Sequence, residues 1–198
     1  MSAKSAKKAK AAPVDRRAGA IRAALGLAAQ LGWAHVTMAD IAQEAGCTLA
    51  DLYDEFDGKG DILAAYERTV SRRVLAGAAA ESAGEPRDAL FDLLMDRFEI
   101  LNEERAALIS ILDGAKTDPK EALLALPALG RSMAWILEAA GLGTSGWKGA
   151  ARIAGLSGVY LAALKVWMDD DSADLSRTMA ALDKQLSRAA SWAGRLAI

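Results

Sequence analysis

The sequence has few of the residues that build disulfide frameworks, metal clusters and β-structure. It contains one cysteine and one histidine in 198 residues, which excludes a disulfide framework and a Cys/His zinc cluster. Aromatic residues make up 6% and there are four prolines, and abundant alanine and leucine favour an all-α protein. No uninterrupted apolar run of about 18 residues occurs, and the N-terminus lacks the apolar core of a secretory signal. We therefore expect a cytoplasmic protein without membrane insertion.

The residue patterns of an enzyme are also missing. There is no nucleophile paired with a base, no glycine loop for phosphate and no spaced pair of carboxylates. Three aspartates stand together at 169–171, where they can either cap a helix or hold a cation, but the spaced ligands of a calcium loop are lacking. We expect no catalysis, no cofactor and no bound metal.

The charge is nearly balanced but unevenly placed. The formal net charge is -2, so any nucleic-acid binding must use a local basic patch. Residues 1–22 carry seven lysines and arginines against one aspartate. The low-complexity residues 1–13 are expected to form a disordered basic arm, which either lies along DNA phosphates or serves only as a solubilising tail.

Residues 37–63 contain two repeated helix-start signals. Thr37 precedes Asp40 by three positions, and Thr48 precedes Asp51 by three, the spacing of a capping box. Gly46 stands between the two segments and permits a tight turn, because glycine adopts the left-handed conformation at no steric cost. The pattern predicts a helix-turn-helix.

This segment resembles the DNA-binding domain of the TetR family of bacterial transcriptional regulators. The resemblance covers about residues 14–66 and rests on residue types at matching spacings: Gly32, Thr37, Ile41, Ala42, Ala45, Gly46, Leu52, Tyr53, Phe56, Lys59 and Leu63. It implies a three-helix reading head for double-stranded operator DNA.

The resemblance and the basic patch assign DNA contacts to nine residues. These are Thr37, Thr48, Leu49, Ala50, Asp51, Tyr53, Lys59, Arg16 and Arg17. Leu49, Ala50 and Asp51 are expected to point into the major groove, with the tyrosine and lysine on phosphates. The alternative for Tyr53 is a half-buried ring that braces the motif.

The reading head departs from the family pattern in its charge. Seven acidic residues stand between positions 37 and 61 against Lys59 alone. Asp40, Asp51 and Asp61 are explained by helix capping and by the helix dipole. Asp54, Glu55 and Asp57 are not explained in this way, and carboxylates near the DNA backbone repel it. At these three positions the family usually has aromatic, polar or basic residues.

Residues 67–198 read as a helical bundle, which brings the total to about nine helices. Helices are expected over residues 60–80 and 147–169, and a short apolar run lies at 107–112. Further helices should start at Pro86, at Pro119 and at Leu175, with Pro127 interrupting the one from Pro119. The bundle is expected to bind a small apolar effector and to form a homodimer.

Two residue sets carry these expectations. The first would line a ligand cavity, or else form ordinary core: Phe91, Met95, Phe98, Met133, Trp135 and Tyr160. The second would form the dimer seam: Leu156, Val159, Leu175, Met179, Leu182 and Leu186.

Two functional hypotheses follow. The first is a homodimeric, ligand-responsive repressor. The second is a lipid- or isoprenoid-binding protein of the same fold whose reading head no longer engages DNA. The acidic residues of the reading head motivate this alternative. A short stretch from Val166 to Asp183, with Trp167, Asp170 and Thr178, is also similar to the end of lipid-binding proteins of ubiquinone biosynthesis.

Overall fold

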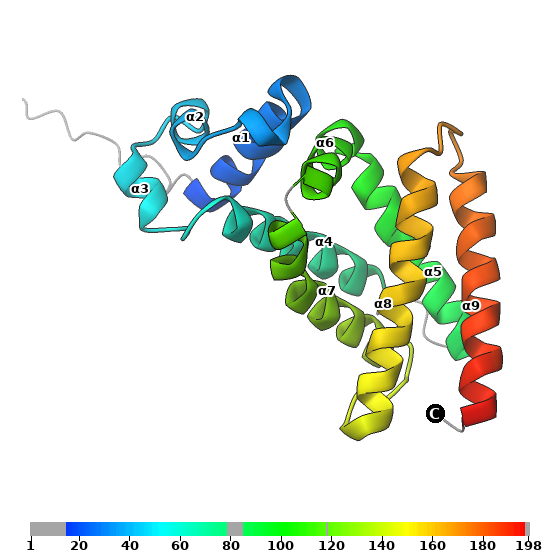
Figure 1. Ribbon diagram of the computed structural model, residues 1–198. Coiled ribbons are helices and arrows are strands. Elements are labelled where there is room, and N and C mark those ends of the chain that lie inside the picture. The colour runs from blue at the N-terminus through cyan, green and yellow to red at the C-terminus, as the bar shows by residue number, and fades with distance from the viewer. Residues whose placement is uncertain (1–14, 79–84, 118, 197–198) are drawn as a thin grey trace, which may run out of the picture.

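The protein is all-helical over the residues that the computed structural model describes, 15–78, 85–117 and 119–196 (Figure 1). The N-terminal elements are α1 (Arg16–Leu31), the 3-10 turn η1 (Trp33–His35), α2 (Met38–Glu44) and α3 (Leu49–Tyr53). The others are α4 (Lys59–Ala78), α5 (Pro86–Asn102), α6 (Arg105–Thr117), α7 (Pro119–Ala139), α8 (Gly146–Met168) and α9 (Ser176–Leu196). The all-α prediction is confirmed. The expected arm, residues 1–13, lies outside the described ranges.

α4 is the connection between the two ends of the molecule. It leaves the cluster formed by α1, α2 and α3 and runs into the body alongside α7, while α8 and α9 lie side by side at the far end (Figure 1). α6 packs on α1 and η1, so the reading head touches the body at two places. Movement of α4 or α6 therefore reaches the reading head directly.

Two predicted helix boundaries are wrong. α7 continues through Pro127. A proline inside a helix removes one backbone hydrogen bond, and an exposed turn can accommodate this loss. That turn is at the surface, since Leu123 is 65% exposed. α6 continues past Gly114 to Thr117. A Cβ at Gly114 would lie 3.5 Å from the Trp33 ring, so this glycine lets α6 pass close to η1.

α8 is the most apolar long helix. By length and composition α8 could cross a membrane, since the mean hydropathy over its most apolar window is 1.2. The sequence did not indicate this, because polar residues interrupt the apolar run. It packs against α7 and α9 and buries Leu156, Tyr160 and Trp167, as a core helix of a globular protein does. Only 28% of that window is buried, so α8 leaves an apolar face open within the described residues.

Candidate nucleic-acid interface and cavities

Both predicted capping boxes are present. At the start of α2, Thr37 Oγ1 accepts from the Asp40 N–H at 3.2 Å and the Thr37 N–H donates to Asp40 Oδ2 at 2.9 Å. At the start of α3, the matching distances for Thr48 and Asp51 are 3.1 and 3.0 Å. Hydrogen bonds from the threonine hydroxyls lower the pKa of both carboxyl groups. These local bonds fix where the two short helices begin.

The turn between α2 and α3 has the geometry that the sequence predicts. Gly46 adopts φ +68°, and the Cys47 N–H donates to the carbonyl of Ala42 at 3.0 Å, which closes the turn. Ile41, Leu52 and Phe56 are at most 3% exposed. Buried apolar contacts therefore hold α3, which is too short to be stable alone.

The outer face of α3 is free of the core. Leu49 is 54% exposed and Tyr53 is 81% exposed, and Thr48 and Ala50 are also exposed. The Tyr53 ring does not brace the motif, so the alternative of a half-buried ring is wrong. The tyrosine and its neighbours are presented to solvent, as a DNA contact requires.

Arg17 is engaged within the protein, which its assignment as a DNA contact did not anticipate. Its Nη1 donates to the carbonyl of Glu55 at 3.0 Å, and its guanidinium lies 4.6 Å from the centroid of the Phe56 ring. Arg17 therefore ties α1 to the loop after α3. Arg16 is exposed and lies 3.5 Å from Asp51 Oδ1, a weak surface pair that leaves it accessible.

Lys59 also has an internal role. Its Nζ donates to the carbonyls of Trp33 and Val36, both at 2.9 Å, and lies 4.4 Å from the centroid of the Trp33 ring. These contacts join the start of α4 to η1. Since an ammonium group has three N–H donors, one remains for a phosphate, and the predicted phosphate contact stays a prediction.

The acidic residues of the reading head differ in their pairing. Glu55 Oε2 and Asp61 Oδ2 lie 3.6 and 3.9 Å from the Arg17 guanidinium. Asp54 and Asp57 are exposed and make no ion pair within the described residues. The departure from the family pattern is thus confined to two uncompensated carboxylates beside α3.

We expect the double substitution Asp54→Asn/Asp57→Asn to raise DNA affinity by about fivefold at low salt, because it removes two negative charges beside the predicted phosphate contacts. The gain should shrink at higher salt, where these charges are screened. Fluorescence anisotropy with duplex DNA measures both effects. Asp92→Asn, at an exposed position on α5, is the control for charge and should leave the affinity unchanged.

The predicted cavity residues mostly belong to the packed core. Phe98 stacks on Tyr160 with ring centroids 5.4 Å apart, and Met133 is fully buried. Met95 and the half-buried Phe91 pack in the same cluster. Trp135 alone of the predicted set lines the groove between α4 and α7, and none of the set lines the cavity between α8 and α9. The packing of the other five favours the ordinary-core alternative, since sequence spacing does not distinguish a filled interior from an open one.

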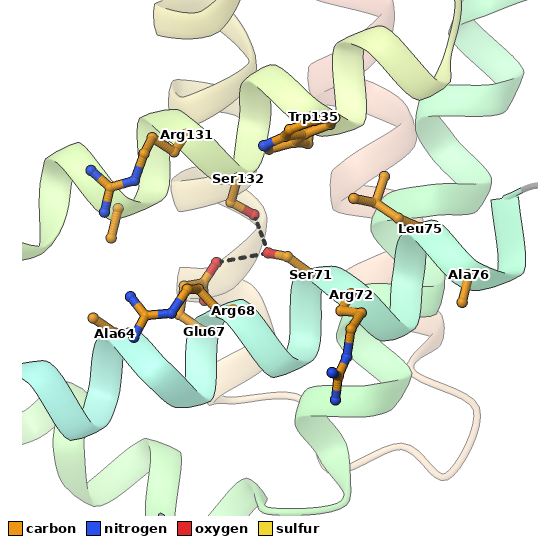
Figure 2. Close-up of a pocket in the computed structure, with 11 residues that line it drawn as sticks. Ala64, Glu67, Arg68, Ser71, Arg72, Leu75, Ala76, Arg131, Ser132 and Trp135 are labelled. Atoms are coloured by element: carbon orange, nitrogen blue, oxygen red, sulfur yellow. Dashed lines mark hydrogen bonds between the residues drawn. The ribbon is translucent and has the colours of Figure 1, made fainter. Parts of the chain in front are cut away.

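The first cavity, the α4–α7 groove, lies between the connecting helix and its neighbour (Figure 2). Its volume is about 650 Å³, within the usual range for small-molecule sites. Its lining residues are Ala64, Glu67, Arg68, Ser71, Arg72, Leu75, Ala76, Ala128, Arg131, Ser132 and Trp135.

A buried ion pair forms the inner wall of this groove. Arg97 of α5 is 1% exposed, and its Nη2 donates to both carboxylate oxygens of Glu67, at 2.7 and 2.6 Å. Its Nη1 donates to Ser132 Oγ at 3.2 Å, and the hydroxyls of Ser71 and Ser132 are 2.8 Å apart. These four side chains, the Arg97 cluster, join α4, α5 and α7.

The second cavity, the α8–α9 cavity, has a volume of about 500 Å³ and a predominantly apolar lining. Its wall includes Leu90, Leu156, Val159, Leu186 and Trp192. Arg87, which pairs with Asp183, and Arg152, which donates to the carbonyl of Gly143 at 2.8 Å, lie at its margin. This cavity suits an apolar molecule better than a charged one.

The predicted dimer seam is largely internal. Leu156, Val159, Leu175, Leu182 and Leu186 are none of them more than 7% exposed, because α8 and α9 of the same chain pack together. In the single chain this seam joins α8 to α9, and the dimer interface stays a prediction. Of the predicted set, Met179 remains accessible, at 42% exposure.

The aspartates after α8 build the corner between α8 and α9. Asp170 is 1% exposed, and its Oδ2 accepts from the N–H and the hydroxyl of Thr178, both at 2.7 Å. Arg105 Nη1 donates to the carbonyl of Trp167 at 2.7 Å. The residues that resemble the lipid-binding proteins therefore hold a helix corner.

These features define a helical protein with a helix-turn-helix at one end and a helical body at the other. Residues 20–66 match the family model described as bacterial regulatory proteins, tetR family. No curated protein matches the sequence.

Solved structures share the fold. A TetR transcriptional regulator from Nitrosomonas europaea ATCC 19718 is 24% identical, with a TM-score of 0.69 over 88% of this chain and 97% of that chain. A TetR transcriptional regulator from Rhodococcus sp. RHA1 is 21% identical, with a TM-score of 0.60 over 86% and 95%. FadR of Thermus thermophilus, a TetR-family repressor in complex with lauroyl-CoA, is 18% identical, with a TM-score of 0.61 over 88% and 93%.

Residues 20–66 are therefore similar to the helix-turn-helix domain of the tetR family of bacterial regulatory proteins, and the chain shares its overall fold with the solved TetR regulators.

Proposed function

We propose that the protein is a homodimeric, ligand-responsive repressor in the bacterial cytoplasm, which binds a pseudo-palindromic operator through residues 14–66 and an effector through residues 67–198. The observation that carries this proposal is the exposed face of α3, on which Tyr53 is 81% exposed. Capping boxes at the starts of α2 and α3 hold this face in place. A dimer would place two such faces on successive turns of DNA.

The effect of Tyr53 on DNA binding tests this proposal. Tyr53→Ala should weaken binding to the protein's own upstream DNA by about tenfold, because a phosphate contact and ring surface are both lost. Tyr53→Phe should weaken DNA binding by less than Tyr53→Ala does, since only the hydroxyl is removed. Anisotropy across a salt series measures both, and wild-type affinity should fall as salt rises. Equal binding by all three proteins would contradict the proposal.

The outer face of α8 is the part of the protomer best suited to meet a second copy. Ala150, Ala154, Gly158 and Leu161 are exposed and recur every three or four residues, so they lie on one face of the helix. Leu161 is 44% exposed, and Met179 on the adjacent helix is 42% exposed. Small residues allow two helices to approach closely, and a two-fold axis here would give a four-helix bundle.

Gly158→Arg should convert the dimer to a monomer. A Cβ at Gly158 meets nothing within 4 Å, so the protomer can hold the side chain, whereas an opposing α8 cannot. Sedimentation velocity at micromolar concentration measures the change. Gly60→Arg is the matched control, since a Cβ at Gly60 also meets nothing within 4 Å. A dimeric Gly158→Arg protein would place the interface elsewhere.

The alternative function is a lipid- or isoprenoid-binding protein without sequence-specific DNA binding. The α8–α9 cavity, with its apolar lining, favours it, as do the unpaired Asp54 and Asp57. Mass spectrometry of the purified protein would then find a tightly held lipid, and the protein would show no salt-dependent retention of specific DNA.

A further inference from the structure

The α4–α7 groove carries positive charge that the protein does not neutralise. Arg131 makes no ion pair within the described residues, and Arg68 has only Asp61 Oδ1 at 3.8 Å. Both side chains are exposed. An exposed pair at that distance contributes little, so both guanidinium groups are available to another anion.

The single carboxylate in the groove is already occupied. Both oxygens of Glu67 accept from Arg97 Nη2, and Arg97 belongs to α5 behind the groove. The charge of Glu67 is thereby balanced from the interior, and it does not compensate the arginines on the open side. The groove consequently has a net positive charge, with Arg72 adding to it at the rim.

The two arginines come from opposite walls. Arg68 is on α4 and Arg131 is on α7, and Figure 2 shows both side chains at the same end of the groove. Trp135 lies further along α7 and is 63% exposed, an unusual fraction for the largest apolar side chain. Leu75 and Ala76 add apolar surface on α4 at the Trp135 side, where Arg72 lies at the rim. The groove thus places two arginines from opposite walls at one end and an exposed indole further along.

We propose that the α4–α7 groove binds an amphipathic anion, with a carboxylate or phosphate head between Arg68 and Arg131 and an acyl or aromatic body against Trp135. A guanidinium group from each wall suits a planar or tetrahedral oxyanion, because both donate paired N–H groups. This inference rests on the proposed function in one respect: the anion is the effector of the repressor.

The position of the groove gives its occupant a route to the DNA-binding face. An anion held by Arg68 and Arg131 bridges α4 to α7, and α4 begins at Lys59, which is bonded to the carbonyls of Trp33 and Val36 in the reading head. Binding that favours one spacing of α4 and α7 therefore favours one position of the reading head.

Isothermal titration calorimetry of the full chain without DNA tests the inference with three ten-carbon probes: decanoate, decyl phosphate and the neutral 1-decanol. We expect at least one anionic probe to bind one per chain and about tenfold or more tighter than the alcohol. Whichever head binds tighter identifies the anion. Arg68→Gln/Arg131→Gln should weaken that binding by about tenfold or more, and Trp135→Ala by several-fold.

Arg188→Gln, an exposed arginine on α9, is the matched control and should bind as the wild type does. Ala190→Trp fills the α8–α9 cavity and should also leave anion binding unchanged. Equal affinity for anionic and neutral probes, binding that survives Arg68→Gln/Arg131→Gln, loss of binding in Ala190→Trp, or no binding of either anion would overturn the inference. Operator binding is measured separately, so a protein that holds the anion but no operator would contradict the repressor proposal alone.

Discussion

Replacing Arg97 with methionine is expected to lower the free energy of unfolding by about 3–5 kcal/mol, because breaking a buried ion pair leaves an uncompensated charge. The Glu67 carboxylate, whose side chain is 23% exposed, would lose both hydrogen bonds from Arg97, and Ser132 would lose a donor. Urea denaturation followed by circular dichroism measures the loss. Glu67→Gln/Arg97→Met should be less destabilised than the sum of the two single variants.

A second ion pair on the same helices provides the control. Arg73 on α4 donates to both oxygens of Glu103 at 2.7 and 2.6 Å, much like the buried pair, but its members are 47% and 55% exposed. Arg73→Met should therefore cost less than about 1 kcal/mol. Equal losses in Arg97→Met and Arg73→Met would show that the Arg97 cluster does not hold α4 to the body.

Asp170→Asn should lower the free energy of unfolding by about 2 kcal/mol at neutral pH, because the carboxylate accepts four hydrogen bonds at a buried helix corner. Burial alone disfavours the charged form, but hydrogen bonds from Ser172 and Thr178 outweigh it and hold the pKa of Asp170 well below its usual range. Asp169→Asn, at the exposed neighbouring position, is the control and should cost little.

The same carboxylate makes stability depend on pH. Because its pKa is lower in the folded protein than in the unfolded chain, its contribution is complete above the unfolded value of about 4 and is lost as the pH falls through the folded value. The difference between wild type and Asp170→Asn should therefore be constant from pH 5 to pH 7 and shrink in stronger acid, as denaturation at fixed pH values would show.

The elements that the sequence predicted well are those fixed by local chemistry. Both capping boxes and the left-handed turn at Gly46 depend on residues three or four apart, so their spacing was sufficient. The continuation of α7 through Pro127 was not predictable in this way. Whether a proline ends a helix or is carried within it depends on what packs around the turn, which is tertiary information.

The candidate site shows the same division. Exposure of the α3 face followed from the pattern of Ile41 and Leu52, but the engagement of Arg17 by Glu55 and Phe56 joins residues 38 positions apart and left no signal in the local sequence. The cavities were missed for a related reason. Apolar spacing identified Phe98 and Tyr160 as inward-facing, yet it could not show that they fill the interior while the open space lies between α4 and α7.

Selection of bound duplexes from a random DNA pool, at near-physiological salt, is the most direct test of the central claim that two copies of this reading head bind one specific operator. We expect enrichment of an inverted repeat whose half-sites lie about one helical turn apart, and loss of that enrichment in Tyr53→Ala. If wild type and Tyr53→Ala retained the pool equally and enriched no sequence, the protein would hold DNA by electrostatic attraction alone and would not bind a specific operator.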